Sequence, residues 1–298
     1  MEIPPRVAVV MRTKDRPGFI GRALEDVLAQ TFGEWEIVVA NDGGDRAAVD
    51  AAIAPFEQRM AGRLRVIDVP RPGGRCAAAN DGIRASSAPF VVLHDDDDFW
   101  APGFLATTVA WLEANPQASG VAVPTEIVYQ VGRDGQWVES GRAPFWAGMQ
   151  QITYTDLLSI NRIVPISLLY RRAVHDEVGF YDESLEAVED WEFYLRVTVD
   201  GTIGFLPGAP LAFWTQRPAA TGAEGNSMFA LGSIHERDDR LVRDRALRAY
   251  VREHGPGLPL FIAGELERAK AELEREIRVH NPVWSRLRGW ARSRRSGG

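Results

Sequence analysis

The first 110 residues alternate between two hydrophobic periods, and this alternation limits the possible folds more than any other feature. Short runs rich in β-branched residues predict buried strands at 6–12, 35–42, 64–69 and 89–94. Stretches with apolar residues at helical spacing follow them, at 19–30, 45–60, 71–87 and 101–116. Strands that alternate with helices predict βαβ units and a mostly parallel central sheet with helices on both faces. We therefore expect a Rossmann-like α/β fold.

The pattern is less regular beyond Gly120. It predicts a strand hairpin turning at 132–135, a strand and a helix within 164–185, an amphipathic helix at 189–199, and closing strands at 202–207 and 210–216. From Ser233 onward the chain is charged and helical, with Glu and Arg or Lys four residues apart. The stretch 217–233, rich in Gly, Ala and Pro, predicts a boundary between a first domain at 1–216 and a helical extension at 217–298.

Composition excludes several classes of protein. The net charge of −7 gives no overall positive field, so we expect no nucleic-acid partner. The chain has one cysteine, Cys76, which excludes an internal disulfide framework and a cysteine-based zinc cluster. There is no signal-peptide pattern and no apolar run long enough to cross a membrane. We therefore expect a cytoplasmic protein.

Residues 93–100 read LHDDDDFW, so the fourth predicted strand ends in four consecutive aspartates, Asp95–Asp98. Clustered carboxylates repel one another, and Mg²⁺ or Mn²⁺ neutralises such oxygen ligands. These ions take one or two carboxylates and complete their coordination with water and phosphate oxygens. The alternative is that Asp98 caps the helix at 101–116. A cap accounts for one aspartate and not for four, so this aspartate tetrad predicts metal and phosphate binding.

Acidic side chains also follow the first two predicted strands, at Asp15 and Asp42. Ligands of open parallel sheets bind at the carboxyl ends of the strands, so we expect these acids and the aspartate tetrad to converge. Asp42 lies in Asn-Asp-Gly-Gly, which is equally consistent with a turn and with a contact to a nucleobase or ribose. The RPGGR stretch at 71–75 resembles a phosphate-binding turn but matches neither the P-loop nor GxGxxG.

Asp190 is a candidate general base. It lies near the start of the helix predicted at 189–199, where one carboxylate could take a proton from a hydroxyl. The alternative is that Asp190 and its neighbour Glu189 only stabilise the helix dipole. The sequence has no GxSxG motif for a nucleophilic serine and no metal-binding histidine spacing. Most aromatic residues are expected in the core, although one or two could line a sugar site among those at 99, 100, 145, 146, 191, 213 and 214.

Together these motifs resemble the family 2 glycosyltransferases, which have the GT-A fold. The resemblance covers residues 6–215 and rests on the order and spacing of VAVVMRTKDRP, RALEDVLAQTFGEWEIVVANDGG, GGRCAAANDGI, FVVLHDDDDFW and EDWEFYLRV. No single stretch is specific, but the combination is. It implies that 1–216 is a GT-A catalytic domain and that 217–298 is a C-terminal extension.

The resemblance also implies roles for individual residues. Asp95-Asp96-Asp97 matches the DxD motif, in which Asp97 is the direct metal ligand and Asp95 faces the ribose or a metal-bound water. Asp95 is the second candidate for contact with the metal. Asp190 matches the catalytic base. The residues expected around the nucleotide and its phosphates are Thr13, Asp15, Arg16, Asp42, Arg71, Arg75, Asn80, Asp95 and Asp96.

The sequence departs from the family pattern at two positions. Ala79 stands where the family commonly has an arginine before Asn80, so Arg71 or Arg75 is the expected substitute. His94 stands where the family usually has an aliphatic or acidic residue before the aspartate tetrad.

The activity that the resemblance implies is an inverting hexosyl transfer in surface polysaccharide or glycolipid assembly. Mg²⁺ or Mn²⁺ would stabilise the diphosphate of a nucleotide-diphosphate sugar while Asp190 deprotonates a hydroxyl of a saccharide or lipid-linked acceptor. A non-catalytic sugar-nucleotide-binding protein is one alternative, against which the presence of both Asp97 and Asp190 argues. A sugar-1-phosphate nucleotidyltransferase is another, but MRTKDRPGF lacks the glycine-rich loop that it needs.

The C-terminal tail is basic and aromatic. Residues 281–298 hold five arginines and no acid, with Trp284, Leu287 and Trp290 three residues apart. Such a segment can lie on an anionic membrane, which predicts peripheral contact through 281–295 at the inner face. A disordered tail and a helix docked on a partner are the alternatives.

Overall fold

The computed structural model describes residues 4–70, 73–134, 136–220, 222 and 232–280. The chain divides into two compact units, Met1–Asp239 and Arg240–Gly298. The first unit extends beyond residue 216 because Asp238 is buried and accepts hydrogen bonds from the backbone N–H groups of Glu186 and Ala187, at 2.9 and 3.0 Å.

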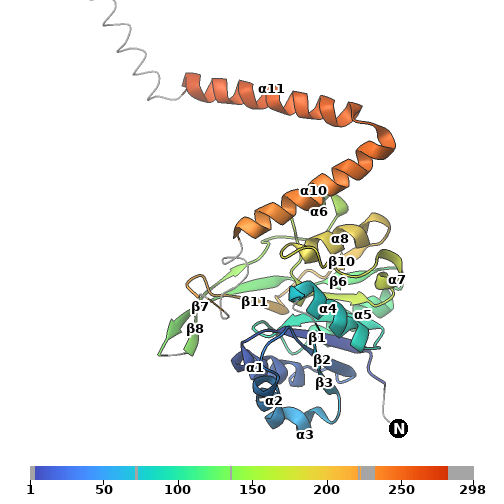
Figure 1. The fold of residues 1–298 in the computed structure, drawn as a ribbon, viewed down its shortest axis with the longest axis vertical. Coiled ribbons are helices and arrows are strands. Elements are labelled where there is room, and N and C mark those ends of the chain that lie inside the picture. Colours follow the sequence, from blue (N-terminus) through green and yellow to red (C-terminus); the bar gives the residue numbers. More distant parts are fainter. Residues whose placement is uncertain (1–3, 71–72, 135, 221, 223–231, 281–298) are drawn as a thin grey trace, which may run out of the picture. The chain divides into compact units, whose positions relative to one another are not determined.

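A seven-stranded sheet forms the centre of the first unit, in the order β10-β6-β9-β4-β1-β2-β3. Figure 1 labels β10 and β6 toward one edge of this sheet and β1, β2 and β3 toward the other. Its strands are β1 (Val7–Thr13), β2 (Trp35–Asn41), β3 (Leu64–Asp68), β4 (Phe90–Asp95), β6 (Gly120–Ala122), β9 (Leu168–Arg171) and β10 (Ile203–Phe205). β1 runs parallel to β2 and β4, β2 to β3, and β6 to β10, whereas β9 is antiparallel to both of its neighbours. The sheet is mostly parallel, as the sequence predicts.

Successive side chains of a strand point to opposite faces of the sheet. Because apolar side chains point to both faces here, helices cover both. Val9 and Met11 of β1 pack with α1 (Pro17–Leu28), α2 (Arg46–Ile53) and α5 (Phe104–Ala114). Val10, between them, packs on the other face with α4 (Gly74–Ala85) and α8 (Glu189–Asp200). The short elements η1 (Ala54–Phe56), α3 (Glu57–Met60), α6 (Tyr154–Ser159), η2 (Pro165–Ser167) and α7 (Val174–Val178) lie in the connections.

A second sheet of four strands, in the order β5-β11-β7-β8, lies in the same unit. Its strands are β5 (Phe99–Trp100), β7 (Thr125–Arg133), β8 (Gln136–Pro144) and β11 (Ala212–Gln216). The β7–β8 pairing confirms the predicted hairpin. β5 follows the aspartate tetrad directly, so the tetrad connects the two sheets. β11 pairs with β5, which brings residues distant in the sequence to the same place.

The C-terminal extension is helical, as predicted, with α10 (Gly232–His254) and α11 (Gly257–His280). Residues 281–298, on which the predicted membrane contact falls, lie outside the described residues. Among the helices that the structure describes, none combines the length and the apolar character that a membrane span requires.

Candidate active site

A cavity of about 560 Å³ lies where β1, β2 and β4 end, and its volume is typical of a small-molecule site. Residues 12–16 and Asp42 line it from the first two strands, and Asp95, Asp97 and Asp98 line it from the aspartate tetrad. Its other walls come from the start of α4, the loop before α8 and the end of β11. The predicted convergence of the acidic strand ends is therefore confirmed.

Most of the predicted site residues line this cavity. Those in the lining are Thr13, Asp15, Arg16, Asp42, Arg75, Asp95 and Asp97. Asn80, Asp96 and Asp190 are described but are not part of the lining. Arg71 lies outside the described residues.

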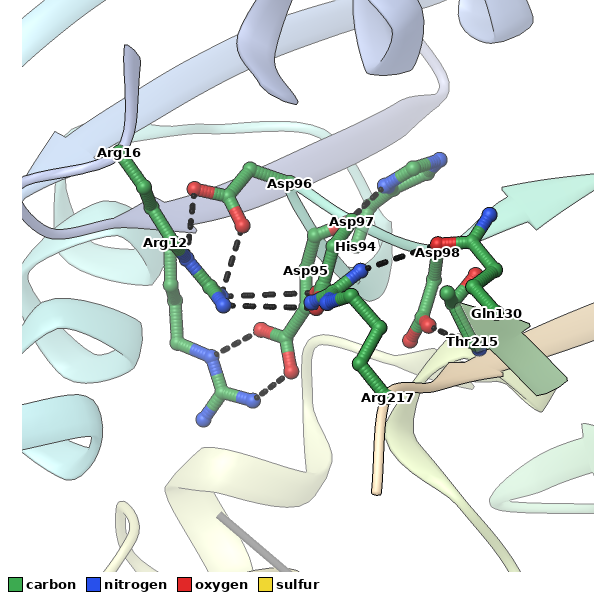
Figure 2. A network of polar contacts seen from close by, with 10 residues as sticks. All are labelled: Arg12, Arg16, His94, Asp95, Asp96, Asp97, Asp98, Gln130, Thr215 and Arg217. Carbon is green, nitrogen blue, oxygen red and sulfur yellow. Dashed lines mark hydrogen bonds and ion pairs between the residues drawn. The ribbon is translucent and has the colours of Figure 1, made fainter. Parts of the chain in front are cut away.

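Arg12 and Asp95 form a bidentate ion pair in the lining of the cavity. They are directly opposite each other in the β1–β4 ladder, and the guanidinium donates to both carboxylate oxygens at 2.7 and 2.8 Å (Figure 2). Arg12 also donates to Glu189 Oε1 at 3.3 Å. Burial favours the neutral acid, but the positive charge of Arg12 outweighs it and lowers the pKa of Asp95. Asp95 is therefore ionised and held in a fixed orientation.

Two more arginines neutralise the middle of the aspartate tetrad. Arg16 lies 2.7 Å from Asp96 Oδ1 and 3.3 Å from Asp97 Oδ2. Arg217 forms an ion pair with Asp97 as well, and donates to Gln130 Oε1 at 3.3 Å. Figure 2 shows Arg16 and Arg217 approaching the tetrad from different elements. Arg217 has no exposed surface, so it enters the site from the protein interior.

Asp98 has a different environment and does not cap a helix. It is buried, and its carboxylate accepts a hydrogen bond of 2.8 Å from the Thr215 backbone N–H. Burial, followed by the negative charges of Asp97 and Asp95, raises the pKa of Asp98 well above its usual value. The N-cap of α5 is Gly103, which makes no side-chain cap bond. The capping alternative for Asp98 is therefore wrong.

His94 fixes the start of the tetrad. It is fully buried; its Nδ1 lies 2.8 Å from the Asp95 carbonyl oxygen and its Nε2 lies 3.1 Å from Asp26 Oδ2. Asp26 also accepts a hydrogen bond from the Trp100 backbone N–H at 2.9 Å, and Trp100 meets the His94 ring edge to face. This histidine therefore anchors the tetrad to α1 and β5 and has a structural role.

The turns after β1 and β2 pack closely together. Asn41 holds its own turn with hydrogen bonds to the Gly44 carbonyl oxygen at 2.8 Å and to Asp68 at 2.9 Å. A Cβ atom on Gly44 would lie 2.8 Å from Asn41 Oδ1 and 2.9 Å from the Asp15 backbone nitrogen, so a larger residue does not fit. Asp15 itself has a φ of 52°, a left-handed conformation that costs energy and is common at functional sites.

Asp42 presents an open hydrogen-bond acceptor at the end of β2. Lys14 lies 3.4 Å from Asp42 Oδ2. The other oxygen, Oδ1, is buried and has no hydrogen-bond partner among the described residues. A buried acceptor without a partner is costly unless a ligand satisfies it, so Asp42 is suited to accept an N–H or O–H from a bound molecule.

The first turn of α8 approaches the same cluster. Glu189 is buried and contacts two residues that line the cavity, Arg12 at 3.3 Å and Arg75 at 3.6 Å. The next residue, Asp190, accepts a hydrogen bond of 2.9 Å from Asn161. Burial and then the negative charge of Glu189 raise the pKa of Asp190 to about 7. Such a carboxyl can both take and release a proton near neutral pH.

Asn80 acts through a neighbour. Its amide donates to the Tyr181 carbonyl oxygen and to Glu183 Oε1, both at 3.0 Å, and accepts from the Tyr181 backbone N–H. Asn80 therefore positions Glu183, which lines the cavity. Ala79 beside it is fully buried, and Arg12 and Arg75 supply positive charge near the start of α8.

The carboxylates of this cavity suit a divalent cation only if a bound molecule supplies part of its coordination. Within the described ranges, no group of three or more His, Cys, Asp or Glu side chains is arranged to hold a metal ion. Asp95 and Asp97 line the cavity, but each is already paired with arginine. Mg²⁺ needs only one or two carboxylates when phosphate and water complete its coordination. The residues thus fit a cation held together with a diphosphate.

The model of glycosyl transferase family 2 matches residues 8–179, more than half of the chain. The chain belongs to this family. It is 29% identical over 289 residues to the uncharacterized glycosyltransferase YwdF of Bacillus subtilis (strain 168), covering 95% of this chain and 98% of that protein. It is 26% identical to the succinoglycan biosynthesis protein ExoU of Rhizobium meliloti (strain 1021), covering 66% of this chain and 58% of ExoU.

Solved structures share the fold. S. aureus TarS in complex with UDP superposes with a TM-score of 0.57 at 19% identity, covering 72% of this chain and 61% of that chain. The mannosyltransferase PcManGT from Pyrobaculum calidifontis, in complex with GDP-Man and Mn²⁺, gives 0.52 at 18% identity, covering 71% and 57%. The GT-A fold predicted for this glycosyltransferase is confirmed.

The site residues that were not predicted from the sequence are Arg12, Gln216 and Arg217. Arg12 could have been found, because a charged residue within the apolar strand VAVVMRT needs a buried partner. Trp214 is one of several aromatic residues that the sequence offers for a sugar site, and it lines the cavity. Gln216 and Arg217 carry no local signal, since β11 reaches the aspartate tetrad only through the second sheet.

Replacing Arg12 with methionine should destabilise the protein by about 3 kcal/mol, because Asp95 and Glu189 lose their shared partner in a buried site. Urea denaturation measures the change. Arg46→Met is the matched control, since Arg46 pairs with two aspartates on the surface and its loss should cost less than about 1 kcal/mol. Equal losses for the two variants would show that the Arg12 network does not hold the site together.

Proposed function

We propose that this glycosyltransferase moves a hexose from a nucleotide-diphosphate sugar to an acceptor hydroxyl, with inversion at the anomeric carbon and with Mg²⁺ or Mn²⁺. The observation that carries the proposal is the cavity where β1, β2 and β4 end, in which clustered aspartates face arginines. A diphosphate and its cation together need both signs of charge in one place.

The two ends of the donor would be held by different elements. The free oxygen of Asp42 would accept a hydrogen bond from the nucleobase, and Asp95, held by Arg12, would face the ribose. Arg16 and Arg75 line the cavity and would bind phosphate oxygens. TarS, which shares the fold, has been solved in complex with UDP and with UDP-GlcNAc, and this supports a donor of the same class.

Asp97, with Asp95 beside it, would hold the cation together with the diphosphate. When bound, the cation would stabilise the negative charge that develops on the leaving group. Arg16 and Arg217 both pair with Asp97. When a cation neutralises Asp97 instead, Arg16 would be available to bind the diphosphate. The Mn²⁺ that accompanies GDP-Man in the PcManGT complex supports the choice of metal.

Asp190 would act as the general base. Its pKa of about 7 suits a carboxylate that must take a proton from an acceptor hydroxyl at neutral pH. Asn161 orients the carboxylate, and Glu189 connects the same turn of α8 to Arg12 and Arg75 in the cavity. A single displacement of this kind needs no enzyme nucleophile.

We further propose that the acceptor belongs to surface polysaccharide or glycolipid assembly. The similarity to ExoU, a succinoglycan biosynthesis protein, supports a role in polysaccharide assembly. A saccharide or lipid-linked acceptor would meet the enzyme at the inner face of the membrane, with the tail at 281–295 in contact with anionic lipid.

Asp190→Asn should leave donor affinity unchanged and lower transfer about a thousandfold, because the amide cannot take the proton. A thermal-shift screen with Mn²⁺ compares UDP, GDP and the UDP-sugars and GDP-sugars, and it selects the donor. Release of the nucleoside diphosphate then measures transfer. Asp200→Asn, at the exposed far end of the same helix, is the control and should keep full activity. Undiminished transfer in Asp190→Asn would contradict the assignment of the base, and no transfer by wild-type protein would favour a non-catalytic binder.

Transfer should rise with pH through about 7, the pKa of Asp190, and level off above it, because the carboxylate is the active form. The raised pKa of Asp190 also stabilises the folded protein at low pH, where the carboxyl is protonated. This stabilisation is lost as the pH rises from the pKa of the group in the unfolded chain to about 7. Rate profiles and thermal unfolding between pH 5 and 9 test both effects. Asp190→Asn should reduce the stability change without abolishing it, because burial also raises the pKa of Asp96 to about 7. A flat rate profile in wild-type protein would contradict the proposed base.

A further inference from the structure

Gln216 is a buried polar side chain whose hydrogen-bonding groups are unused. It ends β11, is 2% exposed, and lines the cavity. Neither Nε2 nor Oε1 of its amide has a hydrogen-bond partner among the described residues. Burying an amide in this way is unfavourable unless a ligand supplies the partners. The site therefore has a donor and an acceptor reserved for a bound molecule.

The neighbours of Gln216 indicate which part of a ligand it faces. Thr215 and Arg217, on either side of it, contact Asp98 and Asp97 of the aspartate tetrad. Trp214 lies two residues earlier, on the same face of the strand, and also lines the cavity. An aromatic ring beside an amide is suited to a ligand with one apolar face and several hydroxyls.

The topology separates Gln216 from the nucleobase end. Asp42 follows β2, and β1 lies between β2 and β4, which carries the tetrad. Gln216 belongs to the second sheet, which begins with β5 directly after the tetrad. A donor with its base at Asp42 and its diphosphate at the tetrad would therefore extend its sugar toward β11.

We propose that Gln216 binds hydroxyls of the transferring sugar, with Trp214 packing against the sugar ring, and that this pair determines sugar specificity. The inference rests on the proposed function, because it takes the cavity to be the donor site. A sugar hydroxyl both donates and accepts, which matches both atoms of the amide. Phosphate oxygens only accept, so a diphosphate would leave Oε1 without a partner.

The test replaces Gln216 with methionine, which keeps the volume and removes both polar atoms. Calorimetry with Mn²⁺ compares UDP with UDP-GlcNAc and GDP with GDP-mannose, for wild-type and variant protein. We expect the sugar nucleotide that wild-type protein binds to bind the variant about tenfold more weakly. The matching nucleoside diphosphate should bind both proteins equally. The melting temperature of the free variant should be equal to or higher than that of wild type, because an unsatisfied buried amide is removed.

Gln30→Met is the matched control. Gln30 is also buried, but its amide is satisfied by the Ala101 carbonyl oxygen and the Leu105 backbone N–H, both at 3.1 Å. This variant should melt at a lower temperature and keep wild-type preference for the sugar nucleotide. Gln216→Asn, whose shorter amide cannot reach as far, provides a second variant and should weaken sugar-nucleotide binding in the same direction.

Three results would overturn the proposal. Equal weakening of the nucleoside diphosphate and the sugar nucleotide would assign Gln216 to the nucleotide or diphosphate. Unchanged binding of both would show that the amide contacts neither. If wild-type protein binds none of the four compounds, the proposed function itself fails. This result is distinguishable from failure of the Gln216 proposal alone, in which wild-type protein binds a sugar nucleotide and the variant binds it equally well.

Discussion

The ion pairs between the aspartate tetrad and three arginines hold the rest of this site in place. Asp95 is held by Arg12, and Asp97 by Arg16 and Arg217. Without these cations the carboxylates at the end of β4 would repel one another in a partly desolvated place. With them, carboxylates and guanidinium groups lie in contact beside one cavity, which is suited to receive a diphosphate and a divalent cation together.

The same pairing connects separate parts of the fold. Arg12 comes from β1 and reaches both the tetrad and the first turn of α8, where Asp190 lies. Arg217 follows β11, so it joins the second sheet to the tetrad. The cavity is therefore built from elements that only the complete first unit brings together. Under the proposed function, the binding of the donor and the position of the base depend on one continuous network.

The repeating part of the molecule could be predicted well from the sequence, and the long-range contacts could not. Alternating periods fix strands and helices locally, so the parallel sheet and the acidic strand ends, including Asp42 and Asp95, were predicted correctly. The second sheet was not predicted, because β5 has only two residues and its partner β11 lies more than 100 residues later. For the same reason neither Arg217 nor Gln216 could be placed. An ion pair between distant segments leaves no period in the sequence.

Under the proposed function, a nucleotide-diphosphate sugar and a divalent cation share the cavity at the aspartate tetrad. Calorimetric titration of wild-type protein with UDP-GlcNAc and with GDP-mannose, each in Mn²⁺ and in EDTA, tests it most directly. We predict that a sugar nucleotide that binds in Mn²⁺ loses at least about tenfold in affinity in EDTA, because Asp97 would hold the cation together with the diphosphate. Equal affinity with and without the metal would contradict a shared cation, and no binding in either condition would contradict the donor site.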